Sequence, residues 1–127
     1  MLIHPNSPHF FLAQVHEWAS PPIDGVGYIP SRELLQKTDE ELHDIITRLE
    51  LERYNVTGWR NFANKWRSVL GHDTTSGKTI IDYGCGCGIE ALQFANNGNE
   101  IILTDIVPSN VALATLVLNI FQFRPKI

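Results

Sequence analysis

The sequence predicts an α/β fold in which a short parallel sheet follows an α-helical N-terminal region. Three observations support this. Two apolar runs, residues 79–81 and 101–103, are each followed closely by an acidic residue, as buried strands are at the ligand side of a parallel sheet. A glycine-rich turn and a helical pattern lie between the two runs. Upstream, apolar residues recur at helical spacing, so we divide the chain into residues 1–76 and residues 77–127.

Proline residues mark a helix start and a loop near the beginning of the helical region. Ser7 and Pro8 form a helix start, and the mostly apolar residues 9–19 predict a short helix after them. Residues 20–30 contain three prolines and two glycines, which predicts an irregular loop, either a plain connection or a lid. Ser31 is a candidate cap for a short helical turn that ends at residue 35.

Two longer helices follow. Thr38 and Glu41 have the spacing of a capping box, and apolar residues then recur at helical spacing through residues 39–53, with a charged face that we interpret as solvated. Residues 59–70 carry a second apolar stripe. We expect this stripe to pack on the sheet, although an aromatic binding surface is the alternative. Its members are Trp59, Phe62, Ala63, Trp66, Val69 and Leu70.

The central motif lies in residues 79–90. An apolar strand ends at Asp82, and glycines at positions 84, 86 and 88 lead into a helix that runs to Asn97-Gly98. Three glycines in five residues permit positive φ angles and let a ligand lie directly on the backbone. The free N–H groups at the start of the helix reach the same place. The motif therefore predicts a ligand loop, with an unliganded turn as the alternative.

A second strand, residues 100–104, ends at Asp105. In nucleoside-binding folds a carboxylate at this position accepts hydrogen bonds from ribose hydroxyls, so Asp82, the glycine loop and Asp105 together predict a nucleoside site. Residues 108–121 follow as a helix that is apolar nearly all round. Residues 123–127 are the possible start of a third strand.

The kind of nucleoside follows from spacing and charge. The dinucleotide fingerprint has its third glycine, or an alanine, three places after the second, but Ile89 stands there and the third glycine is Gly88. Asp82 also puts a negative charge beside the loop, which suits a cation better than a pyrophosphate. A nicotinamide or flavin site remains an alternative.

At these residues the chain resembles the N-terminal part of the class I, Rossmann-like S-adenosylmethionine-dependent methyltransferases. Their first motif, Asp/Glu-x-Gly-x-Gly-x-Gly, and their second-strand acid are matched within residues 79–118. The resemblance implies S-adenosylmethionine as cofactor and S-adenosylhomocysteine as product. It implies cofactor contacts from Asp82, Tyr83, Gly84, Cys85, Gly86, Gly88, Asp105 and Ile106.

The resemblance also implies that the fold is incomplete. The family has seven strands, with the first between the second and the fourth, whereas this chain has two, or three if residues 123–127 form one, so we expect an incomplete three-layer sandwich. Its free sheet edge and apolar C-terminal helix predict a homo-oligomer, unless the N-terminal helices cover them. No catalytic residue can be named, because the family's fourth strand supplies those positions. Tyr54, Trp59 and Arg60 are weaker candidates for cofactor contact. The alternative function is a non-catalytic, nucleoside-binding or self-associating remnant.

Composition narrows the class of protein further. A net charge of −4 over 127 residues gives no support for a nucleic-acid partner held by bulk electrostatics. No apolar run approaches the roughly 20 residues of a membrane span, and no basic and apolar leader is present, so we expect a soluble cytoplasmic protein without a membrane partner.

Cysteine and histidine give no sign of a metal site. The only cysteines, Cys85 and Cys87, lie in the loop, where we expect two small reduced side chains beside the ligand. The five histidines, at positions 4, 9, 16, 43 and 72, show no metal spacing and no paired acid. We interpret all five as surface or packing residues.

Overall fold

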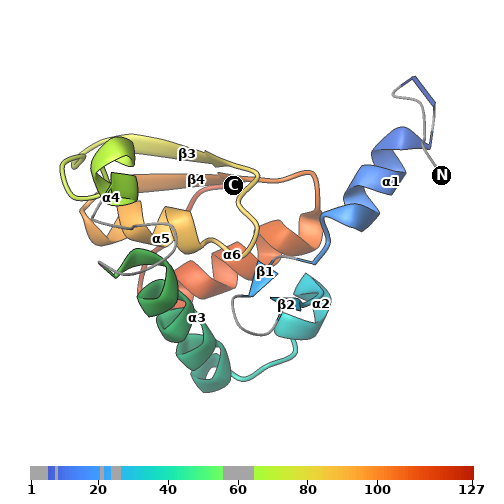
Figure 1. Cartoon of the computed structure of the whole chain (residues 1–127), viewed down its shortest axis with the longest axis horizontal. Helices are drawn as coiled ribbons and strands as arrows, with labels where there is room; N and C mark the ends of the chain where they lie inside the picture. Colours follow the sequence, from blue (N-terminus) through green and yellow to red (C-terminus); the bar gives the residue numbers. More distant parts are fainter. Residues whose placement is uncertain (1–5, 8, 21, 24–26, 56–64) are drawn as a thin grey trace.

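The computed structural model describes residues 6–7, 9–20, 22–23, 27–55 and 65–127. Within these ranges the chain is a mixed α/β protein, as the sequence predicts (Figure 1). Six helices and four strands are described, in the order α1 (Phe10–Glu17), β1 (Pro22–Ile23), β2 (Gly27–Tyr28), α2 (Ser31–Leu34), α3 (Asp39–Tyr54), α4 (Lys65–Leu70), β3 (Thr79–Tyr83), α5 (Ile89–Asn96), β4 (Glu100–Thr104) and α6 (Pro108–Ile120).

The two predicted strands form a parallel pair. β3 and β4 align in register from Thr79 opposite Glu100 to Tyr83 opposite Thr104. The predicted third strand is reduced to one parallel bridge between Ile102 and Lys126, on the edge of β4 away from β3. Within the described ranges the other edge of β3 pairs with no strand.

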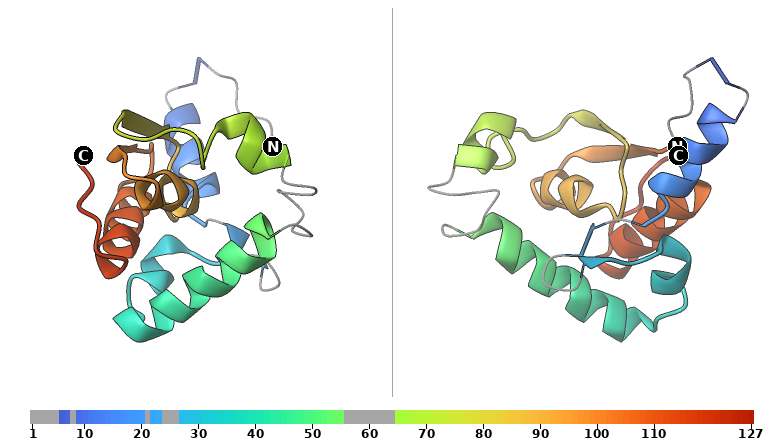
Figure 2. Two further views of the ribbon diagram at one scale, coloured as in Figure 1. Left: turned by 90° about the vertical axis from the view of Figure 1, so that its left-hand side faces the viewer. Right: turned by 45° about the vertical axis from the view of Figure 1, so that its right-hand side comes forward.

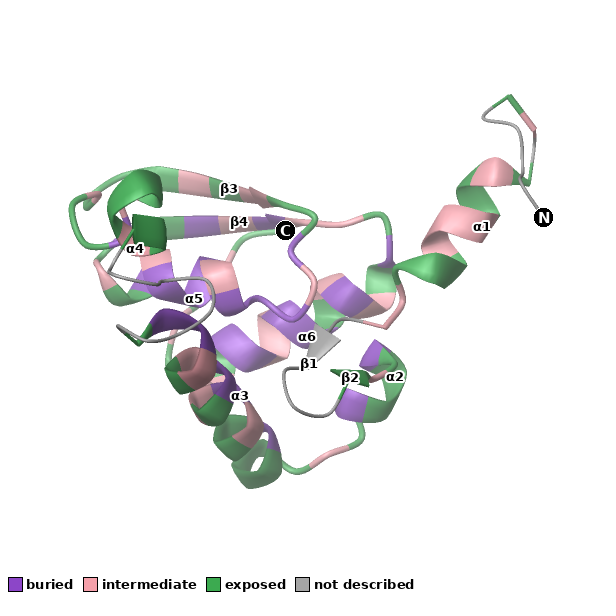
Figure 3. Ribbon diagram, viewed as in Figure 1, coloured by how far each residue is buried: buried purple, intermediate pink, exposed green. Residues whose placement is uncertain are grey.

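Helices cover one face of this sheet. α5 and α6 lie against it, and α2 and α3 pack on the far side of α6 (Figures 1 and 2). Ile101 and Leu103 are buried beneath the helices, whereas Ile81 is 62% exposed and Tyr83 is 87% exposed on the opposite face (Figure 3). The described part of the chain therefore has a single layer of helices, and the second outer layer of the expected sandwich is not among its elements.

The hydrophobic core crosses the predicted boundary at residues 76 and 77. Leu42, Ile46 and Leu49 of α3 form one cluster with Leu92 of α5 and Leu113 of α6. The prediction of an apolar surface on α6 is wrong, because α2 and α3 cover that helix and only Pro108 and Ala112 among its apolar residues are exposed. The N-terminal helices therefore cover α6, which the sequence alone did not decide.

The predicted start of α3 is confirmed. The Glu41 amide donates to Thr38 Oγ1 at 3.2 Å, and the Thr38 amide donates to Glu41 Oε2 at 2.8 Å, which closes the capping box. The reciprocal bonds satisfy two of the amides that a helix start leaves without partners. α3 is the longest helix described and provides much of the core.

Two predictions for residues 20–35 are wrong. The segment expected to be irregular contains β1 and β2, which pair antiparallel through Pro22–Tyr28 and Ile23–Gly27. Two-residue strands tolerate proline because its fixed φ is close to extended values and an edge position needs no N–H. Ser31 does not cap α2 either, since its side chain donates to Ala19 O at 3.0 Å.

The expected packing of the second apolar stripe is wrong where it can be tested. α4 has no buried residue, and Trp66, Val69 and Leu70 are 36%, 81% and 40% exposed. Polar contacts, described below, hold this helix instead of apolar packing. The other three members of the stripe, Trp59, Phe62 and Ala63, lie outside the described residues.

The N-terminal helix stands apart from the core. α1 has no buried residue, and it projects from the body beside the segment that joins β4 to α6 (Figure 1). Phe11, Leu12 and Trp18 are each more than half exposed. No helix in the described ranges has both the length and the apolar character needed to cross a lipid bilayer.

Candidate functional site

The candidate site lies at the carboxyl ends of β3 and β4. The loop between β3 and α5 has φ angles of 80° at Gly84, 51° at Gly86 and 83° at Gly88. L-residues with side chains rarely adopt such angles, so the expectation of positive φ is confirmed at all three positions. Thr104 O accepts hydrogen bonds from the amides of Gly84 at 2.8 Å and Cys85 at 3.0 Å. The loop is therefore fastened to the end of the neighbouring strand.

The first and third glycines serve different purposes. A Cβ at Gly88 would lie 3.0 Å from Ala114 Cβ and 3.1 Å from Ala114 Cα, so this glycine allows the loop to pack directly on α6. A Cβ at Gly84 would meet no described atom within 4 Å. Gly84 is also exposed. The opening of the loop is thus the part that a ligand can approach.

Asp105 contacts the glycine loop. Its Oδ2 accepts a hydrogen bond from the Gly86 amide at 3.0 Å, and its Oδ1 accepts one from the Val107 amide at 2.9 Å. Asn110 Nδ2 lies 3.3 Å from Oδ2 and is a third donor. An ionised carboxylate has about four acceptor positions, so about one remains for a ligand hydroxyl. The same contacts also serve a structural purpose, because they fix the shape of the loop.

Asp82 differs from Asp105 because part of its carboxylate is not engaged. Burial, with the nearby charges of Glu90 and Asp105, raises the pKa of Asp82 to about 6, although a hydrogen bond from the Ala91 amide opposes the shift. Its Oδ2 is buried and has no hydrogen-bond partner among the described residues. A buried acceptor without a donor is costly and marks a place where a donor or a cation is favoured. Asp82 is therefore an acid beside the loop whose carboxylate the described residues leave partly without a donor.

The other predicted contacts divide into exposed and buried positions. Tyr83 and Ile106 are exposed, at 87% and 42%, and the Tyr83 side chain shares the uncovered face of the sheet with Ile81. Cys85 and Cys87 are buried free thiols. Burial, followed by the charges of Asp105 and Asp82, raises the pKa of Cys85 to about 12. Burial likewise raises the pKa of Cys87. Both thiols are therefore protonated packing groups near neutral pH.

A second acidic group, Glu90, was missed by sequence reasoning. Tyr54 Oη donates to Glu90 Oε1 at 2.5 Å, Trp66 Nε1 donates to the same oxygen at 3.1 Å, and His72 Nε2 lies 3.0 Å from Oε2. Burial raises the pKa of Glu90, but hydrogen bonds from His72, Tyr54 and Trp66 and the charge of His72 outweigh it and lower the pKa to about 2. Glu90 therefore joins α5 to the end of α3, to α4 and to the segment before β3.

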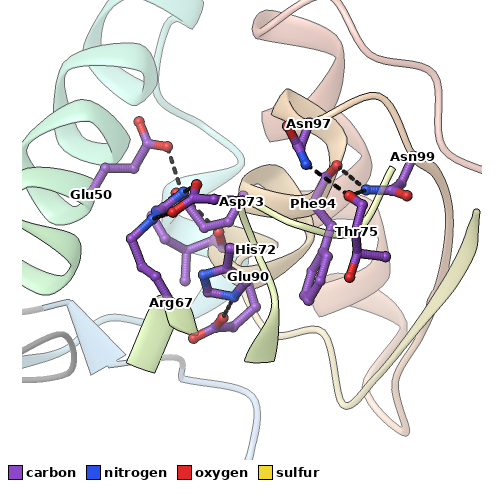
Figure 4. A network of polar contacts seen from close by, with 11 residues as sticks. Glu50, Arg67, His72, Asp73, Thr75, Glu90, Phe94, Asn97 and Asn99 are labelled. Carbon is purple, nitrogen blue, oxygen red and sulfur yellow. Dashed lines mark hydrogen bonds and ion pairs between the residues drawn. The ribbon is translucent and has the colours of Figure 1, made fainter. Parts of the chain in front are cut away.

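His72 overturns the expectation that no histidine has an acidic partner. It is completely buried, faces Glu90, and packs edge-on against Phe94 with ring centroids 4.7 Å apart (Figure 4). His72 and Glu90 are 18 positions apart, so no local spacing could have linked them. The only signal was an acidic residue in the first turn of α5, and that position is common at helix starts.

A chain of polar contacts fastens α4 next to this cluster. Arg67 donates to Asp73 Oδ2 at 3.0 Å and to Gln93 Oε1 at 2.8 Å, and Gln93 Nε2 donates to Glu50 Oε1 at 2.7 Å (Figure 4). These contacts connect α4 with α5 and α3. Tyr54, a weaker candidate for cofactor contact, belongs to the Glu90 cluster. Trp59 and Arg60, the other two candidates, lie outside the described residues.

Comparisons with protein-family models, with curated proteins and with solved structures give no match for this chain.

Proposed function

We propose that this chain is the cofactor-binding portion of a class I, Rossmann-like methyltransferase that binds S-adenosylmethionine. One observation carries the proposal: Asp82 Oδ2 is buried without a partner among the described residues, at the rim of a loop with three positive-φ glycines. The acid at the end of the adjacent strand, Asp105, contacts the same loop. A buried acceptor, an open backbone bend and a second carboxylate together suit an adenosine derivative with a cationic tail.

The charges at the site favour a sulfonium nucleoside over a dinucleotide. Asp82 and Asp105 lie close enough for the charge of Asp105 to raise the pKa of Asp82, and Glu90 adds a further negative charge. A pyrophosphate would be repelled by these groups, whereas a sulfonium and an α-amino group would be attracted. The spacing of the third glycine points the same way.

The proposal gives each residue a role. Asp105 would accept hydrogen bonds from ribose hydroxyls, and Asp82 would face the cationic part of the ligand. The backbone at Gly84 and Gly86 would lie against the ligand, with Tyr83, Cys85, Gly88 and Ile106 shaping its surroundings. When bound, the cofactor supplies an activated methyl group, and transfer needs mainly alignment of the acceptor with that group. No residue is assigned to proton transfer, and the acceptor is left open.

The arrangement of elements supports the same proposal. α5 and α6 cover one face of the β3–β4 pair, while the other face and the outer edge of β3 are uncovered in the described part of the chain. In the family that the motif resembles, the fourth strand and the second helix layer occupy those places. The proposed fold is therefore an incomplete Rossmann-like sandwich.

Calorimetry tests the proposal. We expect saturable binding of S-adenosylhomocysteine and S-adenosylmethionine to the wild-type chain, no binding of NAD, and loss of nucleoside binding in Asp105→Ala. Binding of NAD without binding of S-adenosylhomocysteine would replace the proposal with a nicotinamide site. No heat from any of the three ligands, from a chain shown to be folded by circular dichroism, would overturn it.

A second candidate function is a self-associating module without turnover. The outer edge of β3 carries unpaired backbone groups in the described structure, and the neighbouring Ile81 and Tyr83 side chains are exposed. Neither is a charged or proline residue of the kind that protects sheet edges from pairing. Association through this edge is compatible with nucleoside binding, and light scattering across a concentration range tests it separately.

A further inference from the structure

Asn110 links the proposed ribose acid to the N-terminal helix. This residue lies in the first turn of α6 and is only 2% exposed. Its Nδ2 donates to Trp18 O at 2.9 Å and lies 3.3 Å from Asp105 Oδ2. Both neighbouring atoms can only accept, so the amide nitrogen must face them. A single side chain therefore connects the two groups, which are 87 positions apart in sequence.

The other end of the same side chain is unsatisfied. Asn110 Oδ1 is buried and has no hydrogen-bond partner within the described ranges. A buried acceptor in this state costs free energy that a donor reaching it would recover. Asn110 thus resembles Asp82 in having an unmet acceptor beside the candidate site.

A second anchor holds the root of α1 without touching Asp105. Ala19 O accepts hydrogen bonds from the amide of Ser31 at 2.9 Å and from Ser31 Oγ at 3.0 Å. Ser109 Oγ lies 2.8 Å from Ser31 Oγ and supports this anchor from α6. Ser109 and Asn110 are adjacent in sequence, but only Asn110 contacts the proposed site. They therefore form a matched pair for experiment.

The helix that these anchors hold stands at the ligand side of the sheet. α1 extends from beside the segment that joins β4 to α6 (Figures 1 and 2). Phe11 and Leu12 in this helix and Trp18 just after it are exposed. α1 has no buried residue, so the contacts of its root are what fix its direction. A change at Asn110 would reach α1 directly through Trp18.

We propose that Asn110 is a positioning residue that couples nucleoside binding at Asp105 to the ordering of α1. The inference depends on the proposed function, because it takes a ribose hydroxyl as the ligand of Asp105. Among the three donors to that carboxylate, Asn110 makes the longest contact, 3.3 Å against 3.0 Å from Gly86 and 2.9 Å from Val107. It is therefore the contact that is replaced at least cost when the ligand hydroxyls at Asp105 need more than the one acceptor position that remains there.

The exchange strengthens the hold on α1. Asn110 Nδ2 carries two hydrogens, one for Trp18 O and one for Asp105 Oδ2, and once a ligand hydroxyl takes the place of the longer contact the amide is free to align fully with Trp18 O. Its unpartnered Oδ1 becomes the acceptor for a second hydroxyl of a vicinal diol. Coupling between two sites is reciprocal, so a firmly held α1 in turn tightens the nucleoside.

Hydrogen exchange with S-adenosylhomocysteine as probe tests the coupling. In the wild-type chain, saturating S-adenosylhomocysteine should slow exchange of the amides of residues 10–19 several-fold. Asn110→Asp keeps the shape of the side chain but places an acceptor against two acceptors. In that variant we expect affinity to fall about tenfold, a size typical of coupled sites, and the slowing at α1 to disappear. Ser109→Ala should keep the affinity within about twofold and retain the ligand-dependent slowing.

The outcomes separate the inference from the proposed function. If S-adenosylhomocysteine binds the wild-type chain and α1 exchanges at the same rate with and without it, the coupling is wrong while the nucleoside site stands. This result needs no variant and holds even if Asn110→Asp does not fold. Equal losses of affinity in Asn110→Asp and Ser109→Ala would also overturn the coupling. If S-adenosylhomocysteine does not bind the wild-type chain, the proposed function and the inference fail together.

Discussion

Asp82 and Glu90 are eight positions apart on either side of the glycine loop, yet the pKa values of their carboxyl groups are shifted in opposite directions. Asp82 has a pKa raised to about 6 and a buried oxygen without a partner in the described structure. Glu90 has a pKa lowered to about 2 and receives donors from Tyr54, Trp66 and His72. Burial pushes both pKa values upward, so the supply of donors makes the difference.

The comparison shows how a buried acid can be assigned to structure or to binding. Both oxygens of Glu90 are engaged by the protein: Oε1 accepts two hydrogen bonds, and Oε2, which has no hydrogen-bond partner of good geometry among the described residues, pairs with His72 Nε2 at 3.0 Å. These contacts join three segments to α5, so the role of Glu90 is to hold the fold together. Asp82 is not fully satisfied by the protein, and it borders an open backbone bend. Strong pKa shifts occur in both situations, so the missing partner, rather than the shift, points to a ligand.

The largest expected effect is on Glu90. Glu90→Gln should lower the free energy of unfolding by about 2–4 kcal/mol, because it removes the charge opposite His72 and leaves buried donors poorly matched. Urea denaturation followed by circular dichroism measures this loss. Glu40→Gln, on the exposed face of α3, is the control and should unfold like the wild type. A loss below about 1 kcal/mol would mean that Glu90 does not hold the fold.

Gly88 should come next in size. Gly88→Ala should destabilise the protein by about 2–3 kcal/mol, because it adds strain at a φ of 83° to a close contact with Ala114. Gly77→Ala is the matched control, since its φ of 65° is also positive but its Cβ would meet no described atom within 4 Å. Thermal or urea unfolding of both variants measures the difference between them. Equal losses would show that packing on α6 contributes nothing.

The contribution of Asp82 to stability should change with pH in the opposite direction to that of Glu90. Because its folded-state pKa of about 6 lies above the ordinary 3.8, the folded chain binds more protons between these values. Its contribution to stability should therefore fall as the pH rises from about 4 to 6. Asp82→Asn lacks this penalty and should be more stable than the wild type above pH 6, by about 1–3 kcal/mol, while binding S-adenosylmethionine roughly tenfold more weakly.

Urea unfolding at several pH values measures the contribution of Asp82, and Glu90 supplies the internal contrast. The Glu90 contribution should be present above about pH 4.5 and disappear as the pH falls toward 2, since its pKa is lowered. If the free energies of unfolding of the wild type and of Asp82→Asn changed in parallel between pH 4 and 7, the pKa of Asp82 would not be raised. That result would contradict a buried carboxylate that lacks a donor.

The smallest expected effect concerns association. We expect the wild-type chain to associate with rising concentration, and Ile81→Lys to weaken this, because the charge lies beside the free edge of β3. Ala112→Lys places the same charge at an exposed position of α6. It should leave association unchanged, because α2 and α3 already cover the apolar face of that helix. Light scattering across a concentration range measures both. A wild-type chain that remains monomeric would remove the self-associating alternative.

Local signals predicted much of the fold. The Thr38–Glu41 capping box, the strand–loop–helix order around Gly84 to Gly88 and the αL ending at Gly98 depend on neighbouring residues, and the structure has all three. The free edge of β3 followed from counting strands. The environment of α6 could not be predicted in this way. A helix that is apolar nearly all round is expected to be covered, but its sequence does not indicate which element covers it.

The unpredicted features depend on contacts between distant residues. The Glu90 cluster joins residues up to 36 positions apart, and Asn110 meets Trp18 across 92 positions. The low pKa of Glu90 and the high pKa of Asp82 cannot be read from residue type, since both are acids near a glycine loop. The predicted packing of α4 on the sheet was wrong, because helical periodicity shows that one face of a helix is apolar but not that another element packs against it.

The most direct test of the central claim is a two-dimensional amide NMR titration with S-adenosylhomocysteine. We predict saturable shifts concentrated at the amides of Gly84, Gly86, Asp105 and Ile106. Shifts that are absent at saturating concentration, or that gather instead at the open hollow at the C-terminal end of α6, would contradict a nucleoside site between Asp82 and Asp105. That hollow is lined by Thr115, Asn119, Gln122, Phe123, Arg124 and Pro125.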